Sequence, residues 1–370
     1  MEYWVWLRQI KGLGPVIEKR LLNHFITPKL IYEACEEELM TIMGIGNTLA
    51  KNIISSRSLD KAYVVIEECK SKNIKLLTYD DPLYPSIAKD YAEAPTLLYY
   101  RGNIIDNIEG VAIVGSRRCS DYGKEVAIGA AEYLAKNNIP VISGMAKGID
   151  GYSHTACLRS GGYTIAFLGN GVDVCYPTEH RELMEAIIDN GAVISEYPPG
   201  TRARAEFFPK RNGLISSWSR KVLVVEAAER SGALITANLA KAQGKEIYVP
   251  PHEIYSTTGK GTNQLISEGA NIYLHPSQLI IDNSSRLEVL IKQDSPKKKI
   301  SNERLKIEVA LLPVEEKILS CIIDTSKTIE EIGRAIKMSQ IDLIEYISIM
   351  ELEGKIKAVV GGRYSNLLDL

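Results

Sequence analysis

The chain has 370 residues, of which 45% are hydrophobic and 24% are charged, and its formal net charge is −2. This length predicts two or three domains, and the composition is that of a globular protein with a hydrophobic core. The near-neutral charge excludes a protein that coats nucleic acid through bulk positive charge, so any nucleic-acid site would have to be a local basic groove.

The sequence shows none of the patterns of a secreted, membrane or zinc-binding protein. Its six cysteines are scattered, with no CxxC pair and no histidine at zinc-ligand spacing, which predicts reduced thiols and neither a metal nor a cofactor. No run of about 18 apolar residues occurs, and the first residues show no signal-peptide pattern. We therefore expect a cytoplasmic protein with no membrane partner.

An internal repeat predicts a small helical domain at residues 1–60. Gly12-Leu-Gly14 recurs as Gly44-Ile-Gly46, and each copy lies between stretches with helical spacing of apolar residues. The pattern resembles the paired helix-hairpin-helix motifs of SAM-like domains, in which glycines let the turn approach a phosphate. The alternative is that each Gly-x-Gly only forms a tight turn between helices, without contact to DNA.

Residues 61–281 predict an α/β domain with an N-terminal extension. The extension, 61–110, shows a helix at 61–71 and strands at 75–78 and 96–100, separated by turn residues. Beyond it, apolar and β-branched segments alternate with helical ones, which is typical of a Rossmann-like parallel sheet with helices on both faces. The expected strands are Val111–Val114, Val141–Ser143, Thr164–Leu168, Ala192–Ser195, Lys221–Val225 and Ile247–Val249. The expected helices are Tyr122–Lys136, Tyr152–Arg159, Arg181–Asp189 and Leu234–Ala242.

The remaining residues predict a linker and a third domain. Residues 282–306 are polar and include Pro296-Lys-Lys-Lys299, which is typical of a linker. Residues 307–370 show three short amphipathic helices followed by strands at 356–360 and 363–365, the order of a winged-helix domain. Its candidate recognition helix, Ser339–Glu351, has acidic residues but no lysine or arginine, which favours contact with a protein over contact with phosphate.

Glycine-rich loops follow several of the expected strands. In an open parallel sheet, ligands bind beyond the carboxyl ends of the strands, so these loops should meet at one edge. A glycine, a hydroxyl and an arginine before a helix can hold a phosphate through backbone N–H groups and a guanidinium. Any one loop could be only a tight strand–helix turn, but together they predict a wide anion-binding rim. The candidate residues are Gly115, Ser116, Arg117, Arg118, Ser143, Gly144, Lys147, Ser231, Gly232 and Thr236.

The segment 202–212 interleaves cations with aromatic residues. Cationic side chains can follow the backbone of a single strand while exposed bases stack on aromatic rings, and such stacking tolerates any base. The segment therefore predicts a site for single-stranded DNA without sequence preference, although Phe207 and Phe208 could instead belong to the core. Its candidate contacts are Arg202, Arg204, Phe207, Phe208, Lys210, Arg211 and Asn212.

Several motifs stand in one order along the chain. They are Gly115-Ser-Arg, Ser143-Gly-Met-Ala-x-Gly-Ile-Asp, Phe208-Pro-x-Arg-Asn, Ser231-Gly-Ala-x-x-Thr-Ala and Asn263-x-Leu-Ile-x-x-Gly-Ala, and Tyr84-Pro85 precedes them. Together they resemble the DNA-processing protein A family, also called DprA or Smf. The resemblance spans most of the chain and is strongest over residues 80–275.

The resemblance implies a DNA-binding protein without enzymatic activity. Such a protein binds incoming single-stranded DNA in natural transformation, protects it, helps to displace single-strand-binding protein and loads the RecA recombinase. The resemblance also implies a homodimer formed through the Rossmann-like domain. Arg117 would be the principal DNA contact, supported by Ser143, Gly144, Lys210, Arg211 and Asn212. One departure is Thr178, where some family members have a DNA-binding lysine; Arg202 or Arg204 could supply that contact.

The segment 272–281 is more apolar than the edge of a domain requires. A symmetric partner could cover it, so the candidate dimer contacts are Ile272, Leu274, Leu279 and Ile280. The alternative is that residues 279–281 pack back onto their own sheet.

Two other functions compete with this interpretation. The sheet could belong to a nucleotide phosphoribohydrolase of the lysine-decarboxylase-like (LOG) type. Those enzymes have a Pro-Gly-Gly-x-Gly-Thr loop followed by a carboxylate, whereas this chain reads Ser231-Gly-Ala-Leu-Ile-Thr236. The winged helix could instead make the protein a regulator that binds duplex DNA.

Overall fold

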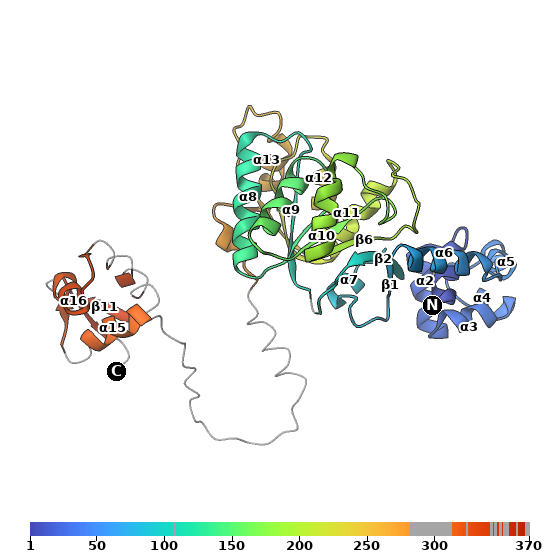
Figure 1. Cartoon of the computed structure of the whole chain (residues 1–370), viewed down its shortest axis with the longest axis horizontal. Helices are drawn as coiled ribbons and strands as arrows, with labels where there is room; N and C mark the ends of the chain where they lie inside the picture. The colour runs from blue at the N-terminus through green and yellow to red at the C-terminus, as the bar shows by residue number, and fades with distance from the viewer. Residues whose placement is uncertain are drawn as a thin grey trace, which may run out of the picture. The chain divides into compact units, whose positions relative to one another are not determined.

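The computed structural model describes residues 1–106 and 108–281 and, nearer the C-terminus, 313–322, 325–340, 343, 346–347, 350, 355–359 and 362–366 (Figure 1). The chain divides into two compact units, Met1–Glu288 and Val289–Leu370. The expected linker, 282–306, lies outside the described residues. Among the described residues, no helix is both long enough and apolar enough to cross a bilayer.

The N-terminal region confirms the expected tandem of helical hairpins. Its helices are α1 (Glu2–Gln9), α2 (Pro15–Phe25), α3 (Pro28–Glu33), α4 (Glu36–Met40) and α5 (Asn47–Ser55). Gly12 and Gly44 turn the chain between the helices of each hairpin with φ angles of 84° and 97°, a left-handed conformation that glycine adopts without strain. Gly14 directly precedes α2 and Gly46 directly precedes α5, so the repeat in sequence is a repeat in structure.

Buried charges join the helical region to the α/β region. Arg8 on α1 donates to Glu18 on α2 at 3.0 Å and to Glu196 of the α/β region at 3.2 Å. The hydroxyl of Thr96 donates to Glu18 at 2.6 Å, and Glu18 is fully buried. Burial raises the pKa of Glu18, while the charge of Arg8 opposes that rise. Breaking such a buried ion pair is strongly destabilising, so the two regions are held in one unit.

The α/β region is built on a nine-stranded mixed sheet in the order β1-β2-β6-β5-β4-β3-β7-β8-β9. The strands are β1 (Lys75–Thr78), β2 (Leu97–Gly102), β3 (Gly110–Val114), β4 (Val141–Ser143), β5 (Thr164–Phe167), β6 (Gly191–Ser195), β7 (Ser219–Val224), β8 (Glu246–Val249) and β9 (Asn271–Ile272). All neighbours from β6 to β9 pair in parallel, which confirms the expected sheet. The strands of the extension, β1 and β2, add an antiparallel edge, a pairing that the sequence pattern did not predict.

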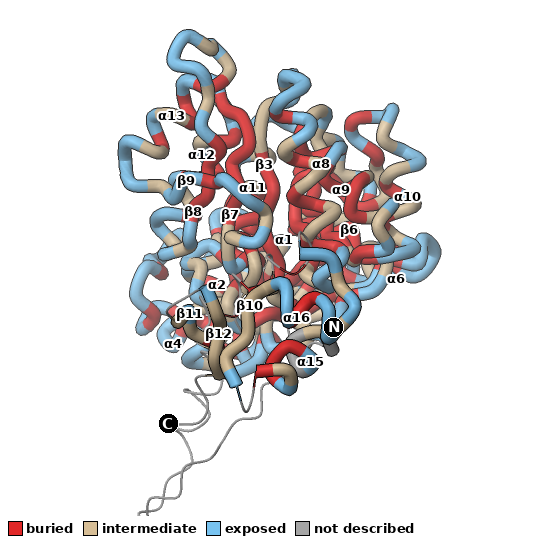
Figure 2. The backbone as a smooth tube through the Cα atoms, turned by 90° about the vertical axis from the view of Figure 1, so that its left-hand side faces the viewer, coloured by how far each residue is buried: buried red, intermediate tan, exposed pale blue. Residues whose placement is uncertain are grey.

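Helices cover both faces of the sheet (Figure 1). They are α6 (Asp60–Ser71), α7 (Ser86–Lys89), α8 (Asp121–Lys136), α9 (Ile149–Arg159), α10 (Arg181–Asn190), α11 (Phe207–Ser217), α12 (Gly232–Ala242) and α13 (Lys260–Ser267), with 3₁₀ turns η1 (Thr178–His180) and η2 (Pro276–Leu279). Along β3, Val111 and Ile113 face the core that includes α8, whereas Ala112 and Val114 face the core that includes α12. The central strands are therefore buried on both faces, as their continuous apolar sequence predicted (Figure 2).

Two of these helices begin inside the glycine-rich loops. α9 begins at Ile149 and α12 at Gly232, in each case earlier than the helical pattern indicated. The motif residues Asp150 and Gly232 therefore belong to first turns of helices at the carboxyl edge of the sheet, and Thr236 follows in the second turn of α12. This placement directs backbone N–H groups toward that edge.

The described part of the C-terminal unit contains α15 (Pro313–Cys321) and α16 (Ile329–Ile336) and an antiparallel sheet in the order β10-β12-β11. The strands are β10 (Lys327–Thr328), β11 (Ile356–Val359) and β12 (Arg363–Asn366). Ile318, Ile332 and Ile356 meet in its core. The acidic residues of the expected recognition helix lie outside the described residues, so the winged-helix assignment stays a prediction.

At the β9 edge, one of the expected dimer contacts, Leu279, is wrong. Leu279 is fully buried in the core of its own sheet beside Tyr273, as the alternative for this segment held. Ile272 is 46% exposed and Leu274 is 76% exposed, while Ile280 is half-buried. The apolar surface at this edge is therefore formed by Ile272 and Leu274, and Leu279 has no free face to offer a partner.

Candidate nucleic-acid interface

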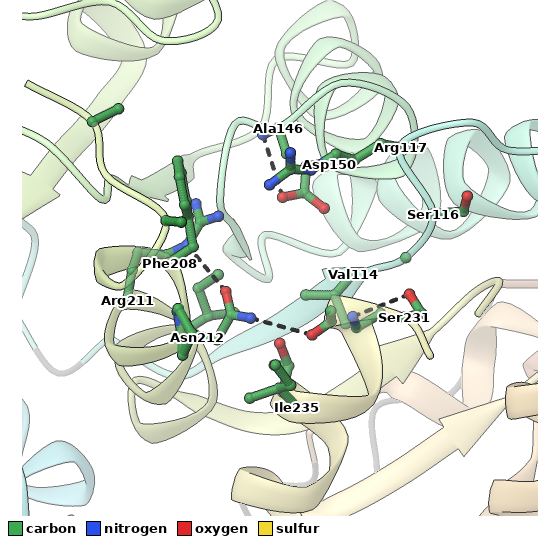
Figure 3. Close-up of a pocket in the computed structure, with 18 of the residues that line it drawn as sticks. Val114, Ser116, Arg117, Ala146, Asp150, Phe208, Arg211, Asn212, Ser231 and Ile235 are labelled. Carbon is green, nitrogen blue, oxygen red and sulfur yellow. Dashed lines mark hydrogen bonds between the residues drawn. The ribbon is translucent and has the colours of Figure 1, made fainter. Parts of the chain in front are cut away.

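A pocket of about 610 Å³, called the rim pocket below, lies beyond the carboxyl ends of β3 and β7 (Figure 3). Its walls are the loop after β3, the first turns of α11 and α12, and the start of α9. It is the place at which the glycine-rich loops were expected to meet. The predicted residues that line it are Gly115, Ser116, Arg117, Arg204, Phe208, Arg211, Asn212, Ser231, Gly232 and Thr236.

Phe208 and Arg117 form an aromatic and cationic wall of the rim pocket. Phe208 is half-buried, and the guanidinium carbon of the exposed Arg117 lies 5.4 Å from its ring centroid. The ring of Tyr176 lies 5.7 Å from the Phe208 ring and also lines the pocket. Phe207 instead stacks on Tyr197, with centroids 4.0 Å apart. The aromatic surface of this pocket is thus Phe208 and Tyr176, and Tyr176 was not among the predicted site residues.

The N-terminus of α12 contributes a second, uncharged part of the wall. Ser231 caps the helix by accepting the N–H of Ala233 at 3.2 Å, and Gly232 and Thr236 line the pocket. The side-chain amide of Asn212 donates to the carbonyl of Gly232 at 3.3 Å, which ties α11 to α12 (Figure 3). The first turn of a helix presents free N–H groups and a positive dipole end, so this wall favours an anion.

Arg211 is a support of the pocket, since it is only 4% exposed. Its guanidinium donates to the backbone carbonyls of Gly144 and, at 2.8 Å, Phe167. The buried carboxylate of Asp150 accepts the N–H groups of Gly144 at 3.1 Å and Ala146 at 3.3 Å. Burial raises the pKa of Asp150 and lowers the pKa of Arg211 to about 10. The two side chains together fix the loop after β4, and a Cβ at position 144 would overlap both.

Ser143 is likewise buried, and its hydroxyl donates to the carbonyl of Ile113 at 2.6 Å. This bond joins the ends of β4 and β3 beneath the pocket. Ser143 and Arg211 were both expected to support DNA binding, and the structure gives each of them a backbone partner within the protein. Their direct contacts are therefore with the backbone of β3, of β5 and of the loop after β4.

Glu226 lies against the N-cap of α8, the helix that follows β3. It is fully buried after β7, and its carboxylate accepts the backbone N–H of Ser120 at 3.0 Å and the Ser120 hydroxyl at 2.6 Å. Ser120 is the N-cap of α8, and a Cβ at Gly123 would lie 2.4 Å from the carboxylate. In dinucleotide-binding folds a pyrophosphate binds at this helix N-terminus. A carboxylate of the protein already fills that place here, which disfavours a nucleotide enzyme of the Rossmann type.

The other predicted cations do not line the rim pocket. Lys147 and Gly144 line a smaller adjoining cavity of about 60 Å³ together with Arg117, and Lys147 forms an ion pair with Glu179. Arg118, Arg202 and Lys210 are exposed, and Thr178 begins the turn η1. Arg202 and Arg204 were the two candidates to replace the missing lysine at position 178. Of these, Arg204 lines the pocket and Arg202 does not.

Comparison with family models gives two matches. Residues 75–284 match the model described as DNA recombination-mediator protein A, and residues 7–57 match the SAM-like helix-hairpin-helix tandem. The first match covers the sheet and every loop of the rim pocket. The second covers the N-terminal hairpins.

Individual proteins show the same similarity. Protein Smf of Synechocystis is 38% identical over 283 residues, which are 75% of this chain and 71% of that protein. The X-ray structure of DNA processing protein A (DprA) from Streptococcus pneumoniae aligns with a TM-score of 0.65 at 30% identity, covering 75% of this chain and 96% of that one. A Helicobacter pylori structure, described as showing the single-stranded DNA binding mode of DNA processing protein A, aligns with a TM-score of 0.51 at 28% identity. It covers 59% of this chain and 96% of that one.

Proposed function

The chain belongs to the DNA recombination-mediator protein A family, and we propose that it binds single-stranded DNA in the rim pocket. The observation that carries the proposal is the exposed Arg117 beside the half-buried ring of Phe208, facing the N-terminus of α12. The H. pylori relative, described as showing a single-stranded DNA binding mode, aligns with 59% of this chain, and the family model matches residues 75–284, which include the rim pocket. The α/β domain is therefore the place to expect this function.

Each wall of the pocket has one task in this proposal. Arg117 holds a phosphate, because its guanidinium can donate two parallel hydrogen bonds to phosphate oxygens. Phe208 and Tyr176 offer ring faces to a base, and stacking of this kind tolerates any base. The N-terminus of α12 stabilises a second phosphate or a base edge. Because stacking on a ring needs an unpaired base and tolerates any base, we expect the pocket to bind a single strand better than a duplex, without sequence preference.

Arg211, Asp150 and Ser143 act as positioning residues. They hold the loop after β4, and Gly148 in that loop packs against the backbone of Arg117, where a Cβ would lie 2.8 Å from the Arg117 carbonyl carbon. A change in this loop would therefore move the guanidinium that holds the phosphate. Arg211 therefore contributes to the site indirectly, by fixing the loop after β4 against which Arg117 packs.

We further propose that the protein protects the strand, helps to displace single-strand-binding protein and loads RecA in natural transformation. In this proposal it acts in the cytoplasm as a homodimer that joins through the β9 edge, where Ile272 and Leu274 are exposed. Membership of a recombination-mediator family supports these steps, and the C-terminal unit would be a winged helix with a protein partner. The competing enzyme of the LOG type is disfavoured by the loop Ser231-Gly-Ala-Leu-Ile-Thr236, which departs from the Pro-Gly-Gly-x-Gly-Thr loop of those enzymes and is not followed by their carboxylate.

Electrophoretic mobility shifts with matched single strands and blunt duplexes test the proposal. The single strand should bind well, the duplex poorly, and strands of different sequence alike. Affinity should fall with salt at a slope of roughly −0.7 per phosphate contacted. Equal binding of duplex, or an affinity that ignores salt, would overturn the proposal.

A further inference from the structure

Exposed aromatic and apolar side chains lie on the same edge of the sheet as the rim pocket. The loop 250–259 follows β8, which pairs in parallel with β7, so it leaves the sheet at the carboxyl edge. In this loop Tyr255 is 88% exposed and Ile254 is 74% exposed. Neither side chain takes part in the rim pocket.

Contacts connect this loop to the start of α8. Tyr122, in the first turn of that helix, is 45% exposed and donates its hydroxyl to the carbonyl of Pro251 at 3.2 Å. Its ring meets the ring of His252 edge to face, with centroids 5.2 Å apart. Because α8 follows the loop 115–118, neighbouring residues lead from the rim pocket past Tyr122 to the loop 250–259.

The distance along this path suits one strand of DNA. Parallel strands lie about 4.8 Å apart, so β3 and β8, which flank β7, are roughly 10 Å apart. The far end of the loop is fixed to the residues after β7, since the N–H of Gly261 donates to the carbonyl of Ala227 at 2.9 Å. A strand that leaves the rim pocket toward β8 would meet this loop within a few nucleotides.

The chemistry of the loop fits bases better than phosphates or a protein partner. The exposed cations Arg230 and Lys260 are balanced by the exposed carboxylates Glu229 and Glu253, so this stretch offers a phosphate no net attraction. The loop after Tyr255 reads Ser-Thr-Thr and is polar, whereas the core of a protein interface is a continuous apolar patch. Apart from Ile254, the exposed side chains beside Tyr255 are polar, and an exposed ring such as that of Tyr255 can serve as a platform for a base.

We propose that Tyr255 is a second stacking platform, on which a base of the same single strand rests after the strand leaves the rim pocket past Tyr122. This inference rests on the proposed function, because it extends the path of the strand that Arg117 and Phe208 hold. It assigns the loop 250–259 to DNA binding and gives the protein a longer site than the rim pocket alone. It also predicts that the bound DNA crosses the edge of the sheet from β3 toward β8.

The test compares Tyr255→Ala, Tyr255→Phe and, as a matched control, Tyr63→Ala in the full chain. Tyr63 is 51% exposed on α6 and belongs to neither the rim pocket nor the loop 250–259. Affinity is measured by fluorescence anisotropy for oligothymidylates of roughly 4 and roughly 16 nucleotides, the range of sizes known for single-strand sites. The mass of each protein is measured by light scattering, and the affinities are repeated at several salt concentrations.

Loss of the ring should weaken binding of the longer oligomer by roughly 5- to 150-fold and leave the shorter one unchanged. Tyr255→Phe and Tyr63→Ala should bind both oligomers like the parent protein. The salt slope and the mass of Tyr255→Ala should match those of the parent, because the ring is uncharged and faces DNA.

Other outcomes separate this inference from the proposed function. If the parent protein binds the longer oligomer and Tyr255→Ala binds it equally well, the second platform is refuted and the rim pocket is not. If Tyr255→Ala loses affinity together with a fall in mass, the loop contacts a second copy of the chain, and the inference is again refuted. If the parent protein binds neither oligomer, the proposed function itself fails.

Discussion

Replacement of Arg117 by alanine should remove most of the affinity for single-stranded DNA while leaving the fold intact. The side chain is exposed, and the ring of Phe208 is its aromatic neighbour at 5.4 Å. A cation–π contact at an exposed site stabilises by about 0.5–1 kcal/mol, so the free energy of unfolding should fall by no more than about 1 kcal/mol. A hydrogen bond to a charged group contributes about 1.5–3 kcal/mol, so the affinity for a single strand should fall roughly 10- to 150-fold.

The salt dependence of binding separates a lost phosphate contact from a general loss. The slope of log affinity against log salt should become shallower by about 0.7 for each phosphate released. Arg117→Lys should keep most of the slope and recover only part of the affinity, because an ammonium group is a point charge. Arg159→Ala, at the last turn of α9 and far from the carboxyl edge, is the matched control and should bind like the parent protein. Normal binding by a folded Arg117→Ala protein would refute the reasoning and move the site elsewhere, for example to the N-terminal hairpins.

Three further predictions concern the rest of the molecule. Removal of residues 300–370 should change single-strand affinity less than tenfold; a larger loss in a binding titration would bring the C-terminal unit into the site. Leu274→Glu should halve the mass measured by light scattering while the protein stays folded. Leu279→Glu should instead unfold the chain, because it would bury a charge, and a monomeric parent protein would refute the dimer. Burial lowers the pKa of His154 to about 3, so the unfolded chain takes up a proton below about pH 6.5 that the folded chain does not. Stability to urea should therefore fall below that pH, by about 1.4 kcal/mol per unit from this residue, and His154→Gln should flatten the fall; parallel pH profiles would contradict this.

The position of the site could be predicted because it follows from a rule about sheets. Parallel strands end at one edge, and the glycine-rich loops after Val114 and Val225 therefore had to meet there. The helical hairpins could be predicted for a similar reason, since Gly12 and Gly44 mark turns that only glycine enters without strain.

The division of labour within the site could not be predicted from the sequence. Arg117 and Arg211 have the same side chain in two loop motifs, yet one is exposed and the other is 4% exposed beneath the pocket. The difference arises because α11 begins at Phe207 and turns Arg211 toward the carbonyls of Gly144 and Phe167, and those partners are distant in sequence. Tertiary contact decides the role, and no local pattern reports it.

Glu226 and Leu279 show the same limit for single residues. Glu226 is a lone carboxylate after a buried strand. Its partner Ser120 lies 106 residues earlier in the chain, so no local pattern could pair the two. Leu279 belongs to an apolar segment whose neighbours are exposed, and only the path of the chain after β9 turns it inward. The sequence pattern marks both segments, and the structure settles which face each side chain takes.

A crystal structure of the protein with a bound oligothymidylate tests the central claim most directly. The account predicts a phosphate against the guanidinium of Arg117 and a base on the ring of Phe208, with the strand leaving the rim pocket toward β8. A strand bound at the N-terminal hairpins or at the C-terminal unit, with the rim pocket empty, would contradict it.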